Sequence, residues 1–407
     1  MATADTADTA GTEPIRQPAP SWMDPAMAAN PQPTYRKLRE QSPILRMDGH
    51  VVLTRWADID QALRRPEAFS SNWSAVDLGN VRPLIPLQID PPNHVKYRRL
   101  LDPLFAPRKL ARLEPEVAKL VNDLIDAFAG RGECDFSDEF AVLLPSQVFL
   151  MLLGLPLDDL DLFLKMKDGI IRPWYAVGTP PESAEAKAYQ REMAAAIYDY
   201  FGRVLDEREQ ERRNDWLSMF LDASVDGVNL SREEILDICL LFLIAGLDTV
   251  TDSLECFFAY LAQHPSQRGL LVKDPSMIPS AVEEMLRWES PVSTIVRVAV
   301  TDTEVRGCPI HAGEQVGLMI GSGNTDAERF DNPDLVDLAR DPNPHIAFGG
   351  GVHRCLGSHL ARLELRVALR EWHARIPDYS LRSGAELTYT PAMRSVEHLP
   401  LVFEPLS

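Results

Sequence analysis

The spacing of apolar and polar residues along the chain predicts a mainly helical protein. Apolar side chains recur at helical intervals in six segments, whereas short runs of β-branched residues, bounded by turn-forming glycines, favour strands. The predicted helices cover residues 35–41, 110–128, 184–211, 232–263, 279–287 and 356–375. The predicted strands lie within 44–54, 295–305, 315–320 and 399–403. We therefore expect a helical body that carries small peripheral β-sheets.

The same pattern divides the chain into an arm and one domain. Residues 1–33 are rich in proline and alanine and lack apolar periodicity, so we expect a flexible N-terminal arm. Residues 34–407 are expected to form a single domain, because 45% of the 407 residues are hydrophobic, enough to bury a large core. The most apolar stretch, residues 235–261, is interrupted by four acidic residues, which favours a buried helix over a membrane span.

Net charge and cysteine usage narrow the class of protein. The formal charge of −19 at pH 7 disfavours nucleic acid and anionic membrane surfaces as partners. The five cysteines are widely scattered and form no C-x-x-C pair, which is typical of a reducing compartment. The first residues show no charged segment followed by an apolar run, so we expect no export signal and a cytoplasmic protein.

A glycine-rich loop delivers one cysteine to the start of a predicted helix. The segment is Phe348-Gly349-Gly350-Gly351-Val352-His353-Arg354-Cys355-Leu356-Gly357. The unpaired N–H groups and partial positive charge of a helix N-terminus favour a thiolate at Cys355, which could ligate a soft metal or act as a nucleophile. Three consecutive glycines would let the backbone lie close to a flat cofactor. The alternative is an ordinary glycine-rich turn with a buried cysteine.

The whole loop resembles the heme-binding signature of the cytochrome P450 superfamily, F-x-x-G-x-x-x-C-x-G, which Phe348, Gly351, Cys355 and Gly357 satisfy. The resemblance implies the cytochrome P450 fold, with heme between a long distal helix and the proximal helix that follows the cysteine loop. It implies heme b, iron protoporphyrin IX, with the Cys355 thiolate as axial ligand of the iron. The further heme contacts that it implies are His94, Arg98, Ala245, Gly246, Arg297, Phe348, Gly349, His353 and Gly357. His94, Arg98, Arg297 and His353 would meet the heme propionates.

Glu284 and Arg287 lie three residues apart in a predicted helix and share one face, so they can pair. Taken alone, such a pair usually belongs to a solvated helix surface, because E-x-x-R arises readily by chance. Its place before the cysteine loop resembles the buried structural pair of the same superfamily, which implies that Arg329 joins it. If the network is buried, loss of one member should release heme.

An acid and a hydroxyl interrupt the longest apolar helix, in the segment Ala245-Gly246-Leu247-Asp248-Thr249. Interior Asp and Thr side chains need partners, and one interpretation is that Thr249 bonds to its own helix while Asp248 pairs elsewhere. The segment also resembles the distal motif of the superfamily. This resemblance implies that Gly246 makes room for dioxygen, that Thr249 holds a water molecule, and that Asp248 links this water to solvent as a proton relay.

Together the resemblances predict a monooxygenase that inserts one atom of dioxygen into an apolar small molecule, with hydroxylation as the default outcome. The chain contains no segment for a flavin or a cysteine-bound cluster, so electrons from NAD(P)H are expected through a separate ferredoxin and ferredoxin reductase. Basic residues expected around the thiolate would dock an acidic ferredoxin, unless they are merely scattered solubilising charges. This predicted docking patch comprises Arg98, Arg99, Arg108, Lys109, Arg112, Arg354, Arg362 and Arg366.

The substrate pocket is expected where the superfamily places it. Its predicted lining residues are Trp73, Leu84, Ile171, Trp174, Leu241, Ile244, Ala245, Val292, Ile295, Val296, Met393 and Val396. Most of them are apolar, so a terpenoid, steroid, fatty acyl chain or aromatic compound would fit. A substrate carboxylate could be received by Arg82, Arg172 or Arg394.

Three other functions stay open from the sequence. A heme-thiolate peroxygenase or isomerase would use the same fold without external electrons, although the presence of both Asp248 and Thr249 disfavours it. A heme-based sensor or ligand-binding protein would bind small molecules without turnover. A helical binding protein without heme would require every motif to be coincidental.

Overall fold

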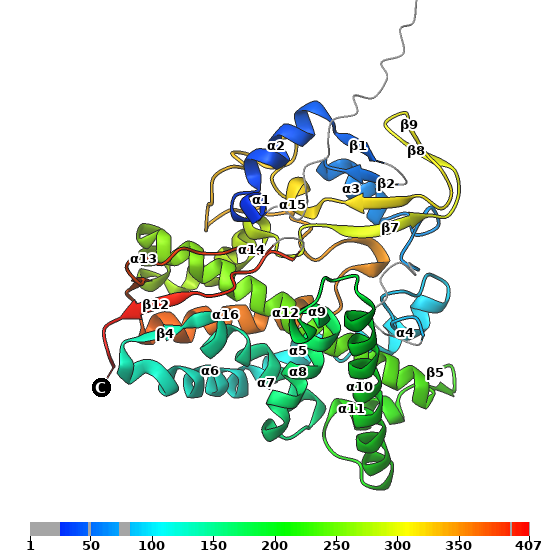
Figure 1. Ribbon diagram of the computed structural model, residues 1–407, viewed down its shortest axis with the longest axis horizontal. Coiled ribbons are helices and arrows are strands. Elements are labelled where there is room, and N and C mark those ends of the chain that lie inside the picture. The colour runs from blue at the N-terminus through cyan, green and yellow to red at the C-terminus, as the bar shows by residue number, and fades with distance from the viewer. Residues whose placement is uncertain (1–24, 48–49, 73–81, 391–392, 407) are drawn as a thin grey trace, which may run out of the picture.

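A helical body and a smaller sheet-containing lobe make up the structure, a computed structural model that describes residues 25–47, 50–72, 82–390 and 393–406. In Figure 1 the lobe lies at the top, where α2 (Gln32–Gln41) and α3 (Trp56–Leu63) accompany the main sheet, and the long helices lie below it. This is the mainly helical arrangement with small sheets that the apolar pattern predicts.

The main sheet has five strands in the order β1-β2-β10-β7-β3. Their bounds are β1 (Ile44–Met47), β2 (His50–Leu53), β3 (Phe69–Ser70), β7 (Ile295–Ala299) and β10 (Gln315–Leu318). β10 pairs in parallel with β2 and antiparallel with β7, so segments far apart in the chain are joined side by side. Buried aliphatic residues such as Val51, Leu53, Val316 and Leu318 give this lobe its own small core.

Three smaller sheets lie at the periphery. One joins β4 (Glu133–Asp135), β11 (Tyr379–Leu381) and β12 (Pro400–Phe403) in the order β11-β12-β4. The other two are hairpins, β5 (Ser224–Val225) with β6 (Val228–Asn229) and β8 (Thr303–Val305) with β9 (Cys308–Ile310).

The helical body surrounds the large hydrophobic core. The remaining α-helices are α1 (Pro25–Ala29), α4 (Asn93–Leu101), α5 (Pro107–Leu110), α6 (Glu114–Phe128), α7 (Leu143–Leu153), α8 (Leu160–Ile171), α9 (Pro173–Val177), α10 (Ala184–Gln210), α11 (Trp216–Asp222), α12 (Arg232–Gln263), α13 (Pro265–Lys273), α14 (Ile278–Glu289), α15 (Ile320–Gly323) and α16 (Ser358–Arg375). Short 3₁₀ or π turns are η1 (Ala111–Leu113), η2 (Ala129–Arg131), η3 (Ser137–Ala141), η4 (Leu157–Asp159), η5 (Pro275–Met277) and η6 (Gly351–His353).

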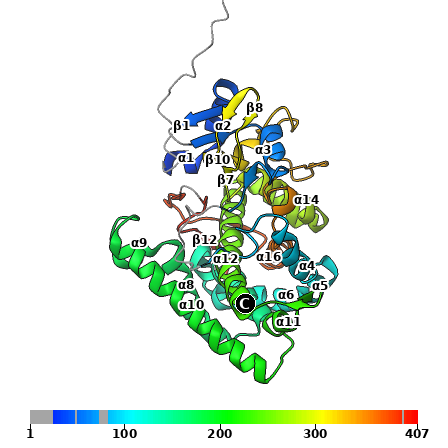
Figure 2. The ribbon, with the colours of Figure 1, turned by 90° about the vertical axis from the view of Figure 1, so that its right-hand side faces the viewer.

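Helix α12 runs through the centre of the body and organises it. A capping box begins it, in which the Ser231 hydroxyl accepts the N–H of Glu234 and the Glu234 carboxylate accepts the N–H of Ser231. Figure 2 shows α12 between α10 and α16, and it also contacts α7, α8 and α14. Most of its side chains are buried, so any polar residue along it must find a partner or line a cavity.

The long periodic helices were predictable to within a few residues, and the region of 232–263 coincides with α12. Helix α7, however, has apolar residues on all its faces and is almost wholly buried, so it has no periodicity to detect.

The predicted flexible arm, residues 1–33, extends too far into the folded chain. From Pro25 onward the chain forms α1 and α2, and the Ala28 carbonyl accepts a 2.7 Å hydrogen bond from Arg394. Among the described helices, none is both long and apolar enough to cross a membrane.

Candidate active site

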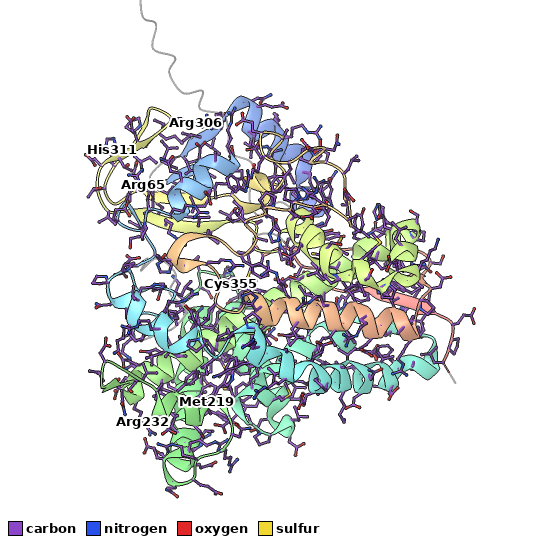
Figure 3. All side chains as sticks on the ribbon, turned by 180° about the vertical axis from the view of Figure 1, so that it is seen from behind. Arg65, Met219, Arg232, Arg306, His311 and Cys355 are labelled. Carbon is purple, nitrogen blue, oxygen red and sulfur yellow. The ribbon has the colours of Figure 1, made fainter. Side chains whose placement is uncertain are left out.

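The cysteine loop is held in a closed turn just before α16. The backbone N–H of Cys355 donates to the Phe348 carbonyl at 2.9 Å, and α16 begins at Ser358. Figure 3 shows Cys355 near the middle of the molecule at the start of this helix. Burial raises the pKa of the Cys355 thiol, although the Gly357 backbone N–H and three nearby guanidinium groups act in the opposite direction. A bound metal cation would stabilise the thiolate form of this sulfur.

Two of the three consecutive glycines serve packing within the protein. Gly351 has φ +62°, and a Cβ there would clash with the carbonyl oxygen of Leu63 at the end of α3. A Cβ at Gly350 would lie 3.3 Å from the Leu63 side chain, whereas one at Gly349 would meet nothing within 4 Å. The interpretation that all three glycines face a cofactor is therefore wrong for Gly350 and Gly351. They let the loop dock on α3.

Cys355 opens onto a cavity of about 340 Å³ that lies between the cysteine loop and α12. This volume is within the range typical of small-molecule sites. On the α12 side the cavity is lined by Leu241, Phe242, Ala245, Gly246, Thr249, Val250 and Ser253. A methyl group added at Gly246 would touch no protein atom within 4 Å, so protein packing does not require glycine there. The bare backbone faces the cavity directly opposite the cysteine loop.

Four basic side chains gather along one edge of this cavity, and two of them lie beside an acid: Arg98 donates to Asp102 at 2.7 Å, and His353 Nε2 lies 3.5 Å from Asp90. The four are His94, Arg98, Arg297 and His353. His94 and Arg297 are only 2% and 8% exposed, and the Nε2 atoms of His94 and His353 have no hydrogen-bond partner among the described residues. Burial, His94 and Arg297 lower the pKa of His353 to about 4, and burial lowers the pKa of Arg297 to about 10. The edge is built to receive anionic groups.

The family model for cytochrome P450 matches residues 40–268 and 273–371. The chain belongs to the cytochrome P450 family. This P450 is 34% identical over 380 residues to the steroid C26-monooxygenase of Mycolicibacterium smegmatis, covering 91% of this chain and 92% of the relative. It is 34% identical over 394 residues to the vitamin D(3) 25-hydroxylase of Pseudonocardia autotrophica, covering 93% and 95%. It is a P450 monooxygenase.

Solved structures confirm the P450 fold. The complex of CYP109E1 from Bacillus megaterium with testosterone superposes with a TM-score of 0.83 at 27% identity and covers 92% of this chain and 99% of that one. CalO2 superposes with a TM-score of 0.85 at 33% identity and covers 94% and 98%.

The residues present fit a heme-thiolate group. Cys355 supplies a soft sulfur donor at the cavity wall. The basic edge supplies cationic partners for the two propionate carboxylates of heme. Each orphaned ring nitrogen of His94 and His353 would gain an acceptor. Of the sequence-predicted heme contacts, His94, Arg98, Ala245, Gly246, Arg297, Phe348, Gly349, His353, Cys355 and Gly357 all line the cavity. Their contacts with heme stay a prediction.

Asp248 and Thr249 face different cavities of the P450, although they are neighbours in α12. The Thr249 hydroxyl lines the cysteine cavity and donates to the Ala245 carbonyl at 3.0 Å. Asp248 is 1% exposed and faces a second cavity, where it accepts a 2.6 Å hydrogen bond from Lys167 and lies 3.4 Å from Arg172. Successive residues on a helix point in different directions, so Asp248 reaches Thr249 only if its side chain leaves Lys167.

Glu284 and Arg287 form the buried pair that the sequence suggested. Both are 0% exposed, and Arg287 donates to both oxygens of Glu284 at 2.7 and 2.8 Å. Arg340 donates to the same carboxylate at 3.0 Å, Asn343 donates at 3.1 Å, and the backbone N–H of Asp337 donates at 2.8 Å. The carboxylate is therefore fully satisfied by groups from its own helix and from one distant segment, residues 337–343.

The prediction that Arg329 joins this pair is wrong. The Arg329 side chain is exposed and lies over the ring of Trp56, 4.3 Å from its centroid. Arg340 occupies the third position, because the irregular segment before the cysteine loop folds back onto α14 and brings its guanidinium group to Glu284. No local sequence pattern distinguishes the two arginines.

The predicted substrate pocket is only partly supported by the structure. The cavity is lined by Leu241, Ala245, Val292 and Ile295 as expected. The structure places Leu84, Ile171, Trp174, Ile244, Val296, Met393 and Val396 outside this lining, and Val396 faces the second cavity. Trp73 lies outside the described residues. The sequence missed a cluster of aromatic lining residues, Phe105, Phe149, Trp216 and Phe242, because tertiary packing alone brings their helices together.

Three arginines proposed to receive a substrate carboxylate already face acids. The pairs are Arg82 with Asp237, Arg172 with Asp248 and Arg394 with Glu289. A different residue, Glu364, lines the cavity and was missed. It is 2% exposed, one of its oxygens has no partner among the described residues, and burial raises its pKa to about 8. Its signal in the sequence is an acid on the apolar face of residues 356–375.

Proposed function

We propose that this P450 hydroxylates a bulky apolar small molecule of the sterol class. The observation that carries the proposal is the arrangement of Cys355 across one cavity from two small residues, Ala245 and Gly246, inside a mostly apolar lining. The steroid and vitamin D hydroxylases among its relatives support the substrate class. The arginines that would have favoured a carboxylate substrate are already engaged, which also supports a neutral one.

Heme, when bound, supplies reductive activation of dioxygen, a chemistry that no side chain of this chain provides. Cys355 would hold its iron, and the basic edge would fix its propionates. Ala245 and Gly246 keep the α12 side of the cavity open. The apolar residues around them exclude water and position the substrate.

Residues of α12 would deliver the protons that the reaction consumes. Thr249 lies on the cavity side, where its hydroxyl can hold a water molecule while bonded to Ala245. Asp248 lies on the side of the second cavity and can take up a proton there when its contact with Lys167 opens. The two residues thus connect a hydrophilic cavity to the reaction cavity across one helix.

Electrons would come from a separate ferredoxin that docks near the cysteine loop. Within this predicted patch, Arg108, Lys109 and Arg112 are exposed and form no ion pair with any described residue. Arg362 is instead bound by both oxygens of Glu283 at 2.6 and 2.7 Å, and Arg99 lies 3.3 Å from Asp226. Together with Arg354, which is also exposed and has no ion pair with a described residue, these cations on α5 and η1 are therefore the part of the patch that a partner would contact.

Arg112→Glu tests this surface. Reversing an exposed, unpaired charge should slow reduction by an acidic ferredoxin about tenfold at low salt and weaken its salt dependence, because steering acts on association. Stopped-flow reduction rates across a salt series measure both effects. Arg382→Glu, at an exposed site on the β11 side, is the control. If Arg112→Glu is reduced at the same rate as the control Arg382→Glu, the ferredoxin does not dock at this site.

The function itself is tested with purified protein reconstituted with heme. The reduced, carbon-monoxide-bound spectrum should show the strongly red-shifted Soret band of thiolate ligation, and Cys355→Ser should lose it. Sterols should then produce a spin-state shift and, with a ferredoxin and its reductase, a product heavier by one oxygen atom. A folded wild-type protein without the band, or with the band and no oxygenated product from any apolar library, would refute the proposal.

A further inference from the structure

A second cavity, of about 800 Å³, lies against the opposite face of α12 from the cysteine. Its walls come from α8, α12, the π-turn η3, Thr390 and residues 395–398. Unlike the cysteine cavity, it is lined mainly by polar and charged side chains. Nothing in the proposed hydroxylation, apart from Asp248, uses these groups.

Three carboxylates line this cavity from successive turns of one helix. Asp248, Asp252 and Glu255 are spaced four and three residues apart, so they share a face and are neighbours. All three are buried, at 1%, 1% and 4% exposure. Three negative charges this close in a buried site would repel strongly, so cations or protons must neutralise them.

The cations contact only the first carboxylate directly. Lys167 donates to Asp248 at 2.6 Å and Arg172 lies 3.4 Å from its other oxygen, and no such ion pair reaches Asp252 or Glu255 among the described residues. Glu255 accepts the backbone N–H of Val396 at 3.0 Å. One oxygen of Asp252 has no partner at all among the described residues. Asp252 therefore faces the cavity with no direct ion pair and without a full set of donors, while Arg172 and Lys167 act on it only from a longer range.

We propose that Asp252 is a proton-holding group, which keeps a proton at neutral pH and resupplies Asp248 with it through water in the second cavity. This inference rests on the proposed function and names the residue that feeds its proton relay. Burial and the negative charges of Asp248 and Glu255 raise the pKa of Asp252 well above its ordinary value, in agreement with the geometry. Asp252 acts through Asp248 and positions the proton rather than touching substrate.

The protons that Asp252 supplies balance those that one turnover consumes. Hydroxylation consumes the substrate, one dioxygen, two electrons from the donor and two protons, and it releases the alcohol and one water. For each proton, the O–H bond of Asp252 breaks as water in the cavity carries the proton to the Asp248 carboxylate. Asp248 then turns from Lys167 to the water at Thr249 and gives the proton up. The Asp252 carboxylate is reprotonated from solvent through the cavity.

Other titratable groups around the cavity could imitate such an effect and must be separated from it. Besides Asp248 and Glu255 they are Asp138, Lys165, Lys167, Asp168, Arg172, Tyr175, Tyr189, Glu397 and His398. Glu255 is the closest rival, because burial also raises its pKa, to about 8. A comparison of Asp252→Asn with Glu255→Gln therefore belongs in the same experiment.

The test uses the heme-loaded enzyme with two routes to product. With the ferredoxin donor, Asp252→Asn should lower product formation about tenfold, enlarge the solvent isotope effect and release more peroxide per electron consumed. With added hydrogen peroxide, which brings its own oxygen and protons, the same variant should match the wild type. Asp252→Glu, which keeps a carboxyl group, should recover part of the donor-supported rate.

The pH profile and the controls decide between the possible outcomes. The alkaline limb of the donor-supported rate should flatten in Asp252→Asn and persist in Glu255→Gln and in Glu233→Gln, an exposed control on the same helix. Unchanged coupling and isotope effect in Asp252→Asn, or equal losses by both routes, would overturn the inference. A wild type that makes no product by either route would instead refute the proposed function.

Discussion

Arg340→Ala should destabilise the fold by about 3–5 kcal/mol and release heme, because it leaves a buried carboxylate without one of its charged partners. Glu284 is completely buried, and Arg340 is one of two guanidinium groups that neutralise it. Its loss also frees the segment before the cysteine loop, since Arg340 donates to the carbonyls of Asp331 and Asn332. Chemical denaturation and the heme-to-protein absorbance ratio measure the two effects.

Arg329→Ala is the matched control for this prediction. The same change of residue type is made eleven positions earlier in the same irregular segment, but Arg329 is exposed and contacts the ring of Trp56 rather than Glu284. Its stability should change by no more than about 1 kcal/mol, as for an exposed cation–π contact. A loss in Arg329→Ala equal to that in Arg340→Ala would show that the network is assigned to the wrong arginine.

Asp248→Asn should lower donor-supported hydroxylation about a hundredfold, because an amide cannot carry a proton across α12. The variant should also lose stability, since the buried Lys167 would lose its buried carboxylate partner and keep only the exposed Asp168. Initial rates of product formation and thermal unfolding of the same preparation measure the two effects.

A double variant separates the proton-relay role of Asp248 from its structural role. Asp248→Asn combined with Lys167→Met removes the stranded charge and should recover most of the stability, because the ammonium group is itself only 4% exposed. The hydroxylation rate should stay low in the double variant. Recovery of both properties together would mean that Asp248 serves the fold alone.

The sequence predicts those parts of the site that local chemistry marks. Cys355 stands in a ten-residue motif, and α12 begins at a capping box and ends just before Pro265, so both were located closely. The pairing of Glu284 with Arg287 follows from helical spacing, which is also a local property. These features need no knowledge of how distant segments meet.

Other parts of the site depend on distant contacts that no local pattern encodes. Arg340 lies 56 residues from Glu284 and reaches it from a segment without regular structure. Ile171 and Trp174 lie away from the cysteine cavity because α8 and α9 lean toward the second cavity. The lack of a direct ion pair at Asp252 is likewise a consequence of packing, since Lys167 and Arg172 contact Asp248, the preceding acid of the helix, instead.

The contact between Gly351 and Leu63 constrains where the molecule can flex. The cysteine loop fits against the carbonyl end of α3 with no room for a side chain, and α3 belongs to the sheet-containing lobe. On its far side the same region is tied to the lobe by the Ile346 N–H, which donates to Asn324 at 2.8 Å. We therefore expect the cysteine loop and the lobe to move together. If so, motion that admits substrate would fall on the helices beyond α12, and the geometry at the sulfur would stay undisturbed.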